Sequence, residues 1–274
     1  MVSQEQRRRQ LAREKFLRQQ QRRTAARRRA RMRNSVIASV LGVVVIGSVA
    51  LYTTKVLKSD KDDKANASAD VTPSPSATSK APDPCAKPAP GSVKKLSWDK
   101  EPAMTVDKSA KYTMKLDTTC GEIDMALKAS AAPHTVNSFD FLAGKGYFDH
   151  TKCHRLTTGG IFVLQCGDPT AVGSGGPGYT IPDENLKDKS LKGSVYPAGT
   201  VAMANTGQPH TGGSQFFLVY QDSPLPPSYT PFGTVSEAGL KVLKKIADAG
   251  ESTGAGDGAP NATVVINKAT VTKS

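Results

Sequence analysis

An uncharged run of 21 residues between Arg33 and Lys55 constrains the fold of this 274-residue chain more than any other feature. Its apolar centre, VIASVLGVVVIGSVALY at 36–52, has the length that a helix needs to cross a bilayer, about 17–25 residues. We therefore expect a single transmembrane helix at 35–54. By the positive-inside rule the basic segment before it stays in the cytoplasm, which sends the rest of the chain outside the cell membrane. A cleavable signal peptide ending near residue 50 is the alternative, although its basic region would be unusually long.

Residues 1–34 form a basic arm with thirteen Lys and Arg residues against Glu5 and Glu14. This arm carries +11 of the formal net charge of +13, so the remainder of the chain is close to neutral. We interpret the arm as a topology signal attracted to anionic lipid headgroups. RNA or ribosome binding is the alternative, but Phe16 is the arm's one aromatic residue, and no nucleic acid partner is expected.

Residues 55–95 are rich in Ala, Ser, Pro, Asp and Lys and have few large apolar side chains. Such a segment cannot bury enough surface to offset its ordering entropy, which predicts a flexible linker. Cys85 near its end is expected to pin the last linker residues onto the domain that follows at 96–274.

The domain at 96–274 is predicted to be mainly β. Residues 111–127 alternate polar and apolar residues around a Thr-Thr-Cys-Gly turn, which is typical of a β-hairpin. Short strands are expected within 153–169, 199–207, 214–221, 230–235 and 262–272. Two segments have helical spacing, one opened by Pro133 and closed by Gly144, the other capped by Ser236 and stopped by Gly250. Many short strands with two helices indicate an antiparallel barrel or sandwich.

The four cysteines all follow the predicted membrane segment, where an oxidising compartment favours disulfides. Cys153 and Cys166 flank one predicted strand pair at its outer ends, which predicts a bond between them. A bond between Cys85 and Cys120 then follows by elimination. No Cys-x-x-C motif occurs and the four His residues lack metal-ligand spacing, so no zinc site is expected.

Three segments, HRLTTGGIFVLQCGDP, MANTGQPHTGGSQFFLV and PFGTV, together resemble the cyclophilin family of peptidyl-prolyl cis–trans isomerases. The resemblance covers about residues 105–274 and is closest to the membrane-tethered cyclophilins of actinomycete-type bacteria. It implies a closed antiparallel eight-stranded β-barrel with two capping helices. It also implies an enzyme that acts on X-Pro bonds of secreted or cell-envelope polypeptides without a cofactor or metal.

The resemblance also implies the site residues. Arg155, which follows His154, matches the catalytic arginine. The predicted substrate-binding residues are Phe162, Val163, Gln165, Ala204, Asn205, Thr206, Gln215, Phe217, Leu225 and Tyr229. Within this set, Phe162, Phe217 and Leu225 are expected to line a proline pocket.

The chemistry of X-Pro rotation suits such a set of residues. Amide resonance gives the rotation a barrier of about 18–20 kcal/mol. At the twisted transition state the lone pair localises on the prolyl nitrogen, where a fixed guanidinium can donate a hydrogen bond that the planar amide accepts poorly. Taken singly, an arginine on a strand is usually a surface group and Phe162 a core residue; the combination in family order favours catalysis. A cyclophilin-like module that binds proline-containing segments without turnover is the alternative.

Two departures from the family pattern bear on the site. Arg155 and Gln165 are ten residues apart, two more than is common in the family, so the matches at Phe162 and Val163 can shift by one residue. Pro224 stands where many members have an aromatic residue that contacts cyclosporin, and Tyr229 where a His is usual. Both substitutions speak against tight cyclosporin binding.

Overall fold

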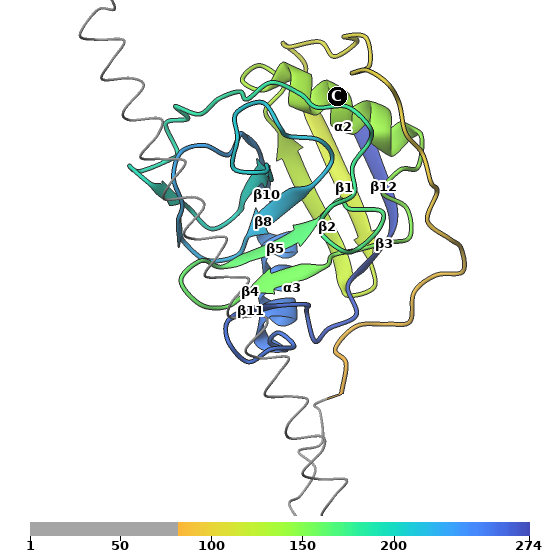
Figure 1. Cartoon of the computed structure of the whole chain (residues 1–274), viewed down its shortest axis with the longest axis vertical. Helices are drawn as coiled ribbons and strands as arrows, with labels where there is room; N and C mark the ends of the chain where they lie inside the picture. The colour runs from red at the N-terminus through yellow and green to blue at the C-terminus, as the bar shows by residue number, and fades with distance from the viewer. Residues whose placement is uncertain (1–81) are drawn as a thin grey trace, which may run out of the picture. The chain divides into compact units, whose positions relative to one another are not determined.

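A computed structural model of the chain describes residues 82–274, and the predicted basic arm, transmembrane segment and most of the linker lie outside these residues. Between residues 82 and 274 no helix is long and apolar enough to cross a membrane. The described elements, labelled as in Figure 1, are β1 (Tyr112–Thr118), β2 (Gly121–Leu127), α2 (Pro133–Gly144), β3 (Thr151–Lys152), β4 (Arg155–Thr157), β5 (Val163–Cys166), β6 (Val195–Tyr196), β7 (Thr200–Met203), β8 (Phe216–Val219), β9 (Ser223–Pro224), β10 (Pro231–Val235), α3 (Glu237–Asp248), β11 (Asp257–Gly258) and β12 (Val265–Lys273).

Ten of these strands form one curled antiparallel sheet in the order β11-β4-β5-β8-β7-β10-β2-β1-β12-β3, and β6 pairs with β9 apart from it. The fold is mainly β with two helices among the described residues, as predicted. The prediction of a closed eight-stranded barrel is wrong in both strand number and closure. The two-residue strand β3 pairs with β12, and the outer neighbour of β4 is β11. The sheet therefore stays open between its edge strands β3 and β11, although only Cys153 and His154 separate β3 from β4 in the chain.

The alternation of side chains along the strands produces two apolar clusters on opposite faces of the sheet. In β8, Phe216 and Leu218 belong to the main core, whereas Phe217 and Val219 belong to a smaller second cluster. The hairpin of β1 and β2 follows the same rule, because alternate residues of β1 are buried and exposed. The second cluster lies beneath the site described below.

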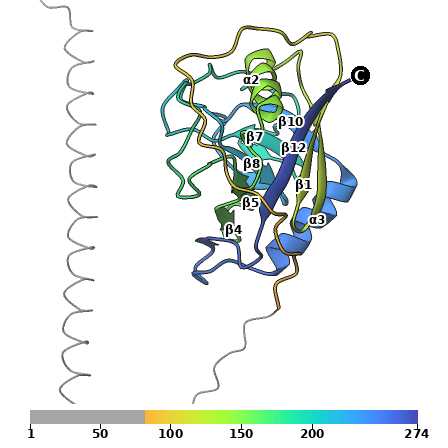
Figure 2. The same cartoon turned by 90° about the vertical axis from the view of Figure 1, so that its right-hand side faces the viewer.

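The helices α2 and α3 lie at opposite ends of the curled sheet (Figures 1 and 2). Helix α2 begins at Pro133 and ends at Gly144, as predicted. Its first turn has no cap from Ala132; instead the carboxylate of Glu184 accepts hydrogen bonds from the backbone N–H groups of His134 (3.0 Å) and Thr135 (2.9 Å). Helix α3 is capped by Ser236, whose side chain accepts from the Gly239 N–H at 3.1 Å.

Both predicted disulfides are present, Cys85–Cys120 and Cys153–Cys166. The first attaches the end of the linker to the turn between β1 and β2, where the Ala86 N–H also donates to the Thr119 carbonyl at 2.8 Å. The second joins the residues that flank β4 and end β5.

Candidate active site

Strand register places the central site residues in one row across the sheet. Arg155 on β4 pairs with Gln165 on β5, Gln165 pairs with Phe217 on β8, and Phe217 pairs with Ala202 on β7. Because side chains of paired residues lie on the same face, the guanidinium, the amide and the phenyl ring are brought together by the ladder alone. The row lies on the face of the second apolar cluster, which includes both Phe217 and Ala202.

A small pocket of about 100 Å³ opens on this row. It is lined by Arg155, Ile161, Val163, Gln165, Ala204, Asn205, Phe217, Leu225 and Tyr229. Its apolar floor is continuous with the second cluster, and the Tyr229 ring meets the Phe217 ring edge-on with centroids 5.4 Å apart. The structure thus places eight of the eleven predicted catalytic and substrate-binding side chains around one pocket.

Phe162 is not among the residues that line this pocket, and Ile161 is there in its place. The Phe162 ring packs edge-on against Tyr220 at a centroid distance of 6.0 Å and contributes to the main core. The reason is the two-residue period of an extended chain, which puts Ile161 on the face of Val163 and Gln165 and turns Phe162 to the other face. In the enlarged turn Ile161, and not Phe162, therefore forms the aliphatic wall of the pocket beside Val163, one residue away from the predicted match.

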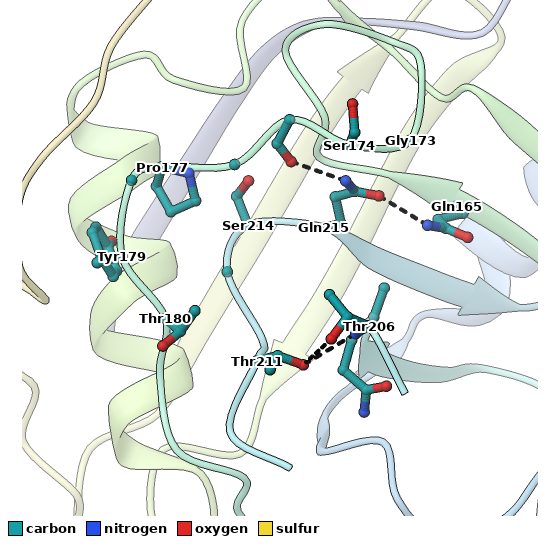
Figure 3. A pocket seen from close by; sticks show the side chains of 16 residues that line it. Gln165, Gly173, Ser174, Pro177, Tyr179, Thr180, Thr206, Thr211, Ser214 and Gln215 are labelled. Carbon is teal, nitrogen blue, oxygen red and sulfur yellow. Dashed lines mark hydrogen bonds between the residues drawn. The ribbon is translucent and has the colours of Figure 1, made fainter. Parts of the chain in front are cut away.

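A second and larger pocket of about 490 Å³ adjoins the first, and the two share Gln165, Ala204 and Asn205. Figure 3 shows this larger pocket, with Thr206 and Gln215, the two remaining predicted residues, on its wall. The Thr211 hydroxyl accepts a hydrogen bond from the Thr206 N–H at 3.1 Å. Because they share these lining residues, the two pockets form one continuous groove.

A relay of amides connects the arginine to the far wall of this groove. Arg155 Nη1 donates to Gln165 Oε1 at 3.2 Å. Gln165 Nε2 donates to Gln215 Oε1 at 2.9 Å, and Gln215 Nε2 donates to the Gly175 carbonyl at 2.9 Å (Figure 3). Each amide therefore has its orientation set by both neighbours.

The loop that supplies Gly175 is held by Asp168, which is fully buried. Its carboxylate accepts from the Thr170 N–H and hydroxyl, both at 2.7 Å, and from the Gly173 N–H at 2.6 Å. Burial raises the pKa of the Asp168 carboxyl, but these hydrogen bonds outweigh it and keep the pKa below its ordinary value. Asp168 therefore shapes the pocket wall as an anion.

The guanidinium of Arg155 has a partner that the sequence reasoning missed. Arg155 Nε and Nη2 donate to the two carboxylate oxygens of Asp257, each at 2.7 Å. The hydrogen bond to Asp257 is the main cause that raises the pKa of Arg155, and the same bond lowers the pKa of Asp257. Asp257 is 102 residues away in the chain, and no local pattern marks it.

The pocket beside this ion pair offers a fixed cation, an apolar wall and amides, and no cysteine, serine or histidine lines it. Across residues 82–274, no three or more His, Cys, Asp or Glu side chains are grouped so that they could hold a metal ion. Such a site can bind an apolar ring and donate hydrogen bonds to a neighbouring amide.

Comparison with known proteins agrees with this chemistry. The family model for cyclophilin type peptidyl-prolyl cis-trans isomerase/CLD matches residues 113–271, more than half of the chain. The chain belongs to the cyclophilin family. Within residues 113–271 the match includes every element from β2 to β11 and each residue of the small pocket.

Among curated cyclophilins, the probable peptidyl-prolyl cis-trans isomerase B of Mycobacterium leprae is 50% identical over 165 residues, which cover 57% of this chain and 56% of that protein. The protein of the same name from Mycobacterium tuberculosis is 48% identical over 165 residues, covering 57% of this chain and 53% of the relative. The chain thus spans about half the length of these mycobacterial relatives. Peptidyl-prolyl cis-trans isomerase B of Bacillus subtilis is 40% identical over 128 residues, 46% of this chain and 84% of that protein.

Among solved structures, a cyclophilin type peptidyl-prolyl cis-trans isomerase of Cryptosporidium parvum is similar with a TM-score of 0.50 and 26% identity. The similarity covers 60% of this chain and 99% of that structure. The similarity to this structure therefore leaves 40% of the chain unmatched, and the family model leaves residues 1–112 unmatched.

Proposed function

We propose that the chain is a peptidyl-prolyl cis–trans isomerase that rotates X-Pro bonds in secreted or cell-envelope proteins. The observation that carries this proposal is the position of the Arg155 guanidinium at the rim of an apolar pocket of about 100 Å³. The similarity to proteins named peptidyl-prolyl cis-trans isomerase B supports the same activity.

The substrate proline ring occupies the apolar pocket between Val163, Phe217 and Leu225, which excludes water from the bond to be rotated. The flanking peptide lies along Ala204–Thr206 in the adjoining pocket. With both sides held, rotation is confined to the X-Pro bond. No covalent bond forms or breaks, so neither a nucleophile nor a proton relay is needed.

Arg155 supplies the differential stabilisation. As the amide twists, the lone pair that resonance had shared becomes localised on the prolyl nitrogen, and a guanidinium N–H donates to it. This hydrogen bond is stronger in the transition state than in the planar ground state, and only such an interaction accelerates the step. The raised pKa of Arg155 keeps the donor charged at every physiological pH.

Isomerisation of a proline-containing tetrapeptide by the full chain in detergent tests this function. We expect activity well above the uncatalysed rate and a loss of about 10²-fold or more in kcat/KM in Arg155→Ala, the scale typical of one positioned transition-state donor. An uncatalysed rate with the native chain, or full activity in Arg155→Ala, would overturn the proposal. Peptide binding without turnover would instead support a binding module or chaperone.

We infer further that the enzyme is anchored in the cell membrane by residues 35–54, with the basic arm of residues 1–34 in the cytoplasm and the isomerase domain outside. The uncharged apolar run and the charge asymmetry before it support this topology. The two disulfides support an oxidising compartment for the domain. The relatives from Mycobacterium leprae and Mycobacterium tuberculosis support a kinship with proteins of actinomycetes.

Protease added outside intact cells tests this orientation. The isomerase domain should be degraded while an epitope on the basic arm stays protected until the cells are lysed. Protection of the domain in intact cells would refute the outward orientation. Release of the domain into the medium without added protease would instead indicate the cleaved signal peptide.

A further inference from the structure

Asp257, the partner of the Arg155 guanidinium, lies on β11 at the edge of the sheet. The short strand β11 pairs antiparallel with β4, with Asp257 opposite Thr157 and Gly258 opposite Leu156. The Thr158 N–H donates to the Gly256 carbonyl at 2.9 Å and extends this pairing. Asp257 is thereby held beside the strand that carries the arginine.

The loop that presents Asp257 is itself internally braced. The Glu251 carboxylate, on a residue only 8% exposed, accepts from the Thr253 N–H at 2.6 Å and from the Gly256 N–H at 2.8 Å. Hydrogen bonds, first that from the Thr253 N–H, lower the pKa of Glu251, so the brace is ionised at neutral pH. Asp257 is thus a carboxylate on a fixed support, although its side chain is 55% exposed.

Counting donors shows what this arrangement does to the guanidinium. A guanidinium has five N–H groups in a planar fork. Asp257 takes one from Nε and one from Nη2, and Gln165 takes one from Nη1. One N–H on each terminal nitrogen is left for substrate, and the bidentate grip fixes the plane in which both lie.

We propose that Asp257 is a positioning residue of the isomerase, acting through Arg155 to aim its two remaining N–H groups into the small pocket. The inference rests on the proposed function, because it assigns Arg155 the catalytic hydrogen bond. Asp257 does not line the pocket and contributes no donor of its own.

The alternative is that Arg155 and Asp257 form an ordinary surface ion pair with no effect on catalysis. The two side chains are 37% and 55% exposed, and exposed pairs of this kind contribute little to stability. The reaction rate depends on the orientation of Arg155 much more strongly than stability does, because misplacement of a catalytic group by about 1 Å can lower a rate by about 10²-fold. Loss of Asp257 should therefore separate the two properties.

An effect of Asp257 on the charge of the site and an effect on the orientation of Arg155 predict opposite changes in activity. Removing the carboxylate leaves the guanidinium's positive field less neutralised, so a site that depended on field alone would gain activity in Asp257→Asn. A site that depends on the orientation of the guanidinium would lose activity in the same variant. The direction of the change in activity therefore shows whether the field or the orientation of Arg155 limits the rate.

The test compares Asp257→Asn and Asp257→Ala with the native full-length chain in the tetrapeptide isomerisation assay. We expect kcat to fall about tenfold in both variants with KM changed less than twofold, the pattern of an interaction made only in the transition state. The matched control is Glu122→Gln, which breaks the exposed ion pair between Glu122 and Lys115 (3.0 Å), two residues that do not line the pocket. This control should keep native kcat, and its midpoint of thermal unfolding should match that of Asp257→Asn.

The same substitution in the Arg155→Ala background separates this inference from the proposed function. If Asp257 acts through Arg155, adding Asp257→Ala to Arg155→Ala lowers kcat/KM by less than about 1.5-fold. A full additional tenfold loss there, or native or higher activity in Asp257→Asn, would overturn the positioning role. Failure of Arg155→Ala itself to lose activity would instead overturn the proposed function.

Discussion

The disulfide between Cys153 and Cys166 closes the strand pair that carries Arg155 and Gln165, and its removal separates stability from catalysis. Both cysteines are buried, at 5% and 0% exposure, so alanine is the suitable replacement because it adds no unpaired hydroxyl. The perturbation is therefore the double variant Cys153→Ala/Cys166→Ala.

The magnitude follows from the length of chain that each disulfide closes. Cys153 and Cys166 are separated by 13 positions, for which the chain-entropy relation gives about 3 kcal/mol of stabilisation. Cys85 and Cys120 are separated by 35 positions, for which it gives about 4 kcal/mol. For a domain of this size about 3 kcal/mol corresponds to a fall of roughly 6–12 °C in the midpoint of thermal unfolding.

Trp98 provides the assay, because it is the chain's one tryptophan and packs edge-on against Phe141 with ring centroids 5.0 Å apart. Its fluorescence reports loss of the domain's packing in urea or on heating. We expect both disulfide variants to unfold at lower urea concentration than the native chain, with Cys85→Ala/Cys120→Ala the less stable of the two.

Activity below the transition is the second readout. The strand β5 also pairs with β8 over four residue pairs, from Val163↔Val219 to Cys166↔Phe216. This ladder holds Gln165 in register without the disulfide, so kcat/KM of Cys153→Ala/Cys166→Ala should stay within about twofold of the native value at temperatures where the domain is folded. An unchanged unfolding midpoint would refute the entropic reasoning. Lost activity in a fully folded variant would show that the disulfide, and not the ladder, places the arginine.

Three further predictions follow from single residues. Ile161→Ala should raise KM about fivefold with little change in stability, because Ile161 lines the pocket. Phe162→Ala should lower the free energy of unfolding by about 2 kcal/mol or more and leave KM near native, because its ring packs against Tyr220. The opposite pattern would show that Phe162, as the sequence match predicted, and not Ile161 contacts the substrate. Burial lowers the pKa of His154, although the charge of Asp168 opposes this shift, so His154 binds a proton more readily in the unfolded chain than in the folded one. The stability of the domain should therefore fall as the pH drops below about 6.5. Urea titrations at pH 7.5 and 5.5 should show a smaller fall in stability for His154→Leu than for the native chain. Gly167→Ala should destabilise the domain by about 1–3 kcal/mol in the same titrations, because φ is +85° and the added Cβ would lie 2.2 Å from the Ser214 carbonyl oxygen; a native urea midpoint would contradict the close approach.

The elements that the sequence predicted correctly are those with a strong local signal. The hairpin of β1 and β2 has seven residues in each strand and clean alternation, and α2 and α3 have a proline or serine at the start. Barrel closure has no such signal. It depends on whether two-residue strands such as β3 and β11 pair with one another, and their few side chains carry no periodic pattern.

The site shows the same division between local and distant causes. Arg155, Gln165 and Phe217 were predictable because each lies in a strand whose motif is contiguous. Asp257 and Glu184 were not, since each acts on a residue about 50 or more positions away: Asp257 on Arg155, and Glu184 on the first turn of α2. A carboxylate in a loop looks the same in sequence whether it faces solvent or caps a helix.

The arrangement of the site implies that binding and rate are controlled by different parts of the fold. The arginine is held by the β4–β5 pairing and by Asp257, whereas the aliphatic wall at Ile161 lies in the enlarged turn before Val163, outside the paired residues of β5. A change in the length or composition of that turn should therefore alter the shape of the pocket without moving the guanidinium. The two-residue enlargement relative to the common family spacing should accordingly appear in KM and substrate preference, and kcat should follow the Arg155–Asp257 pair.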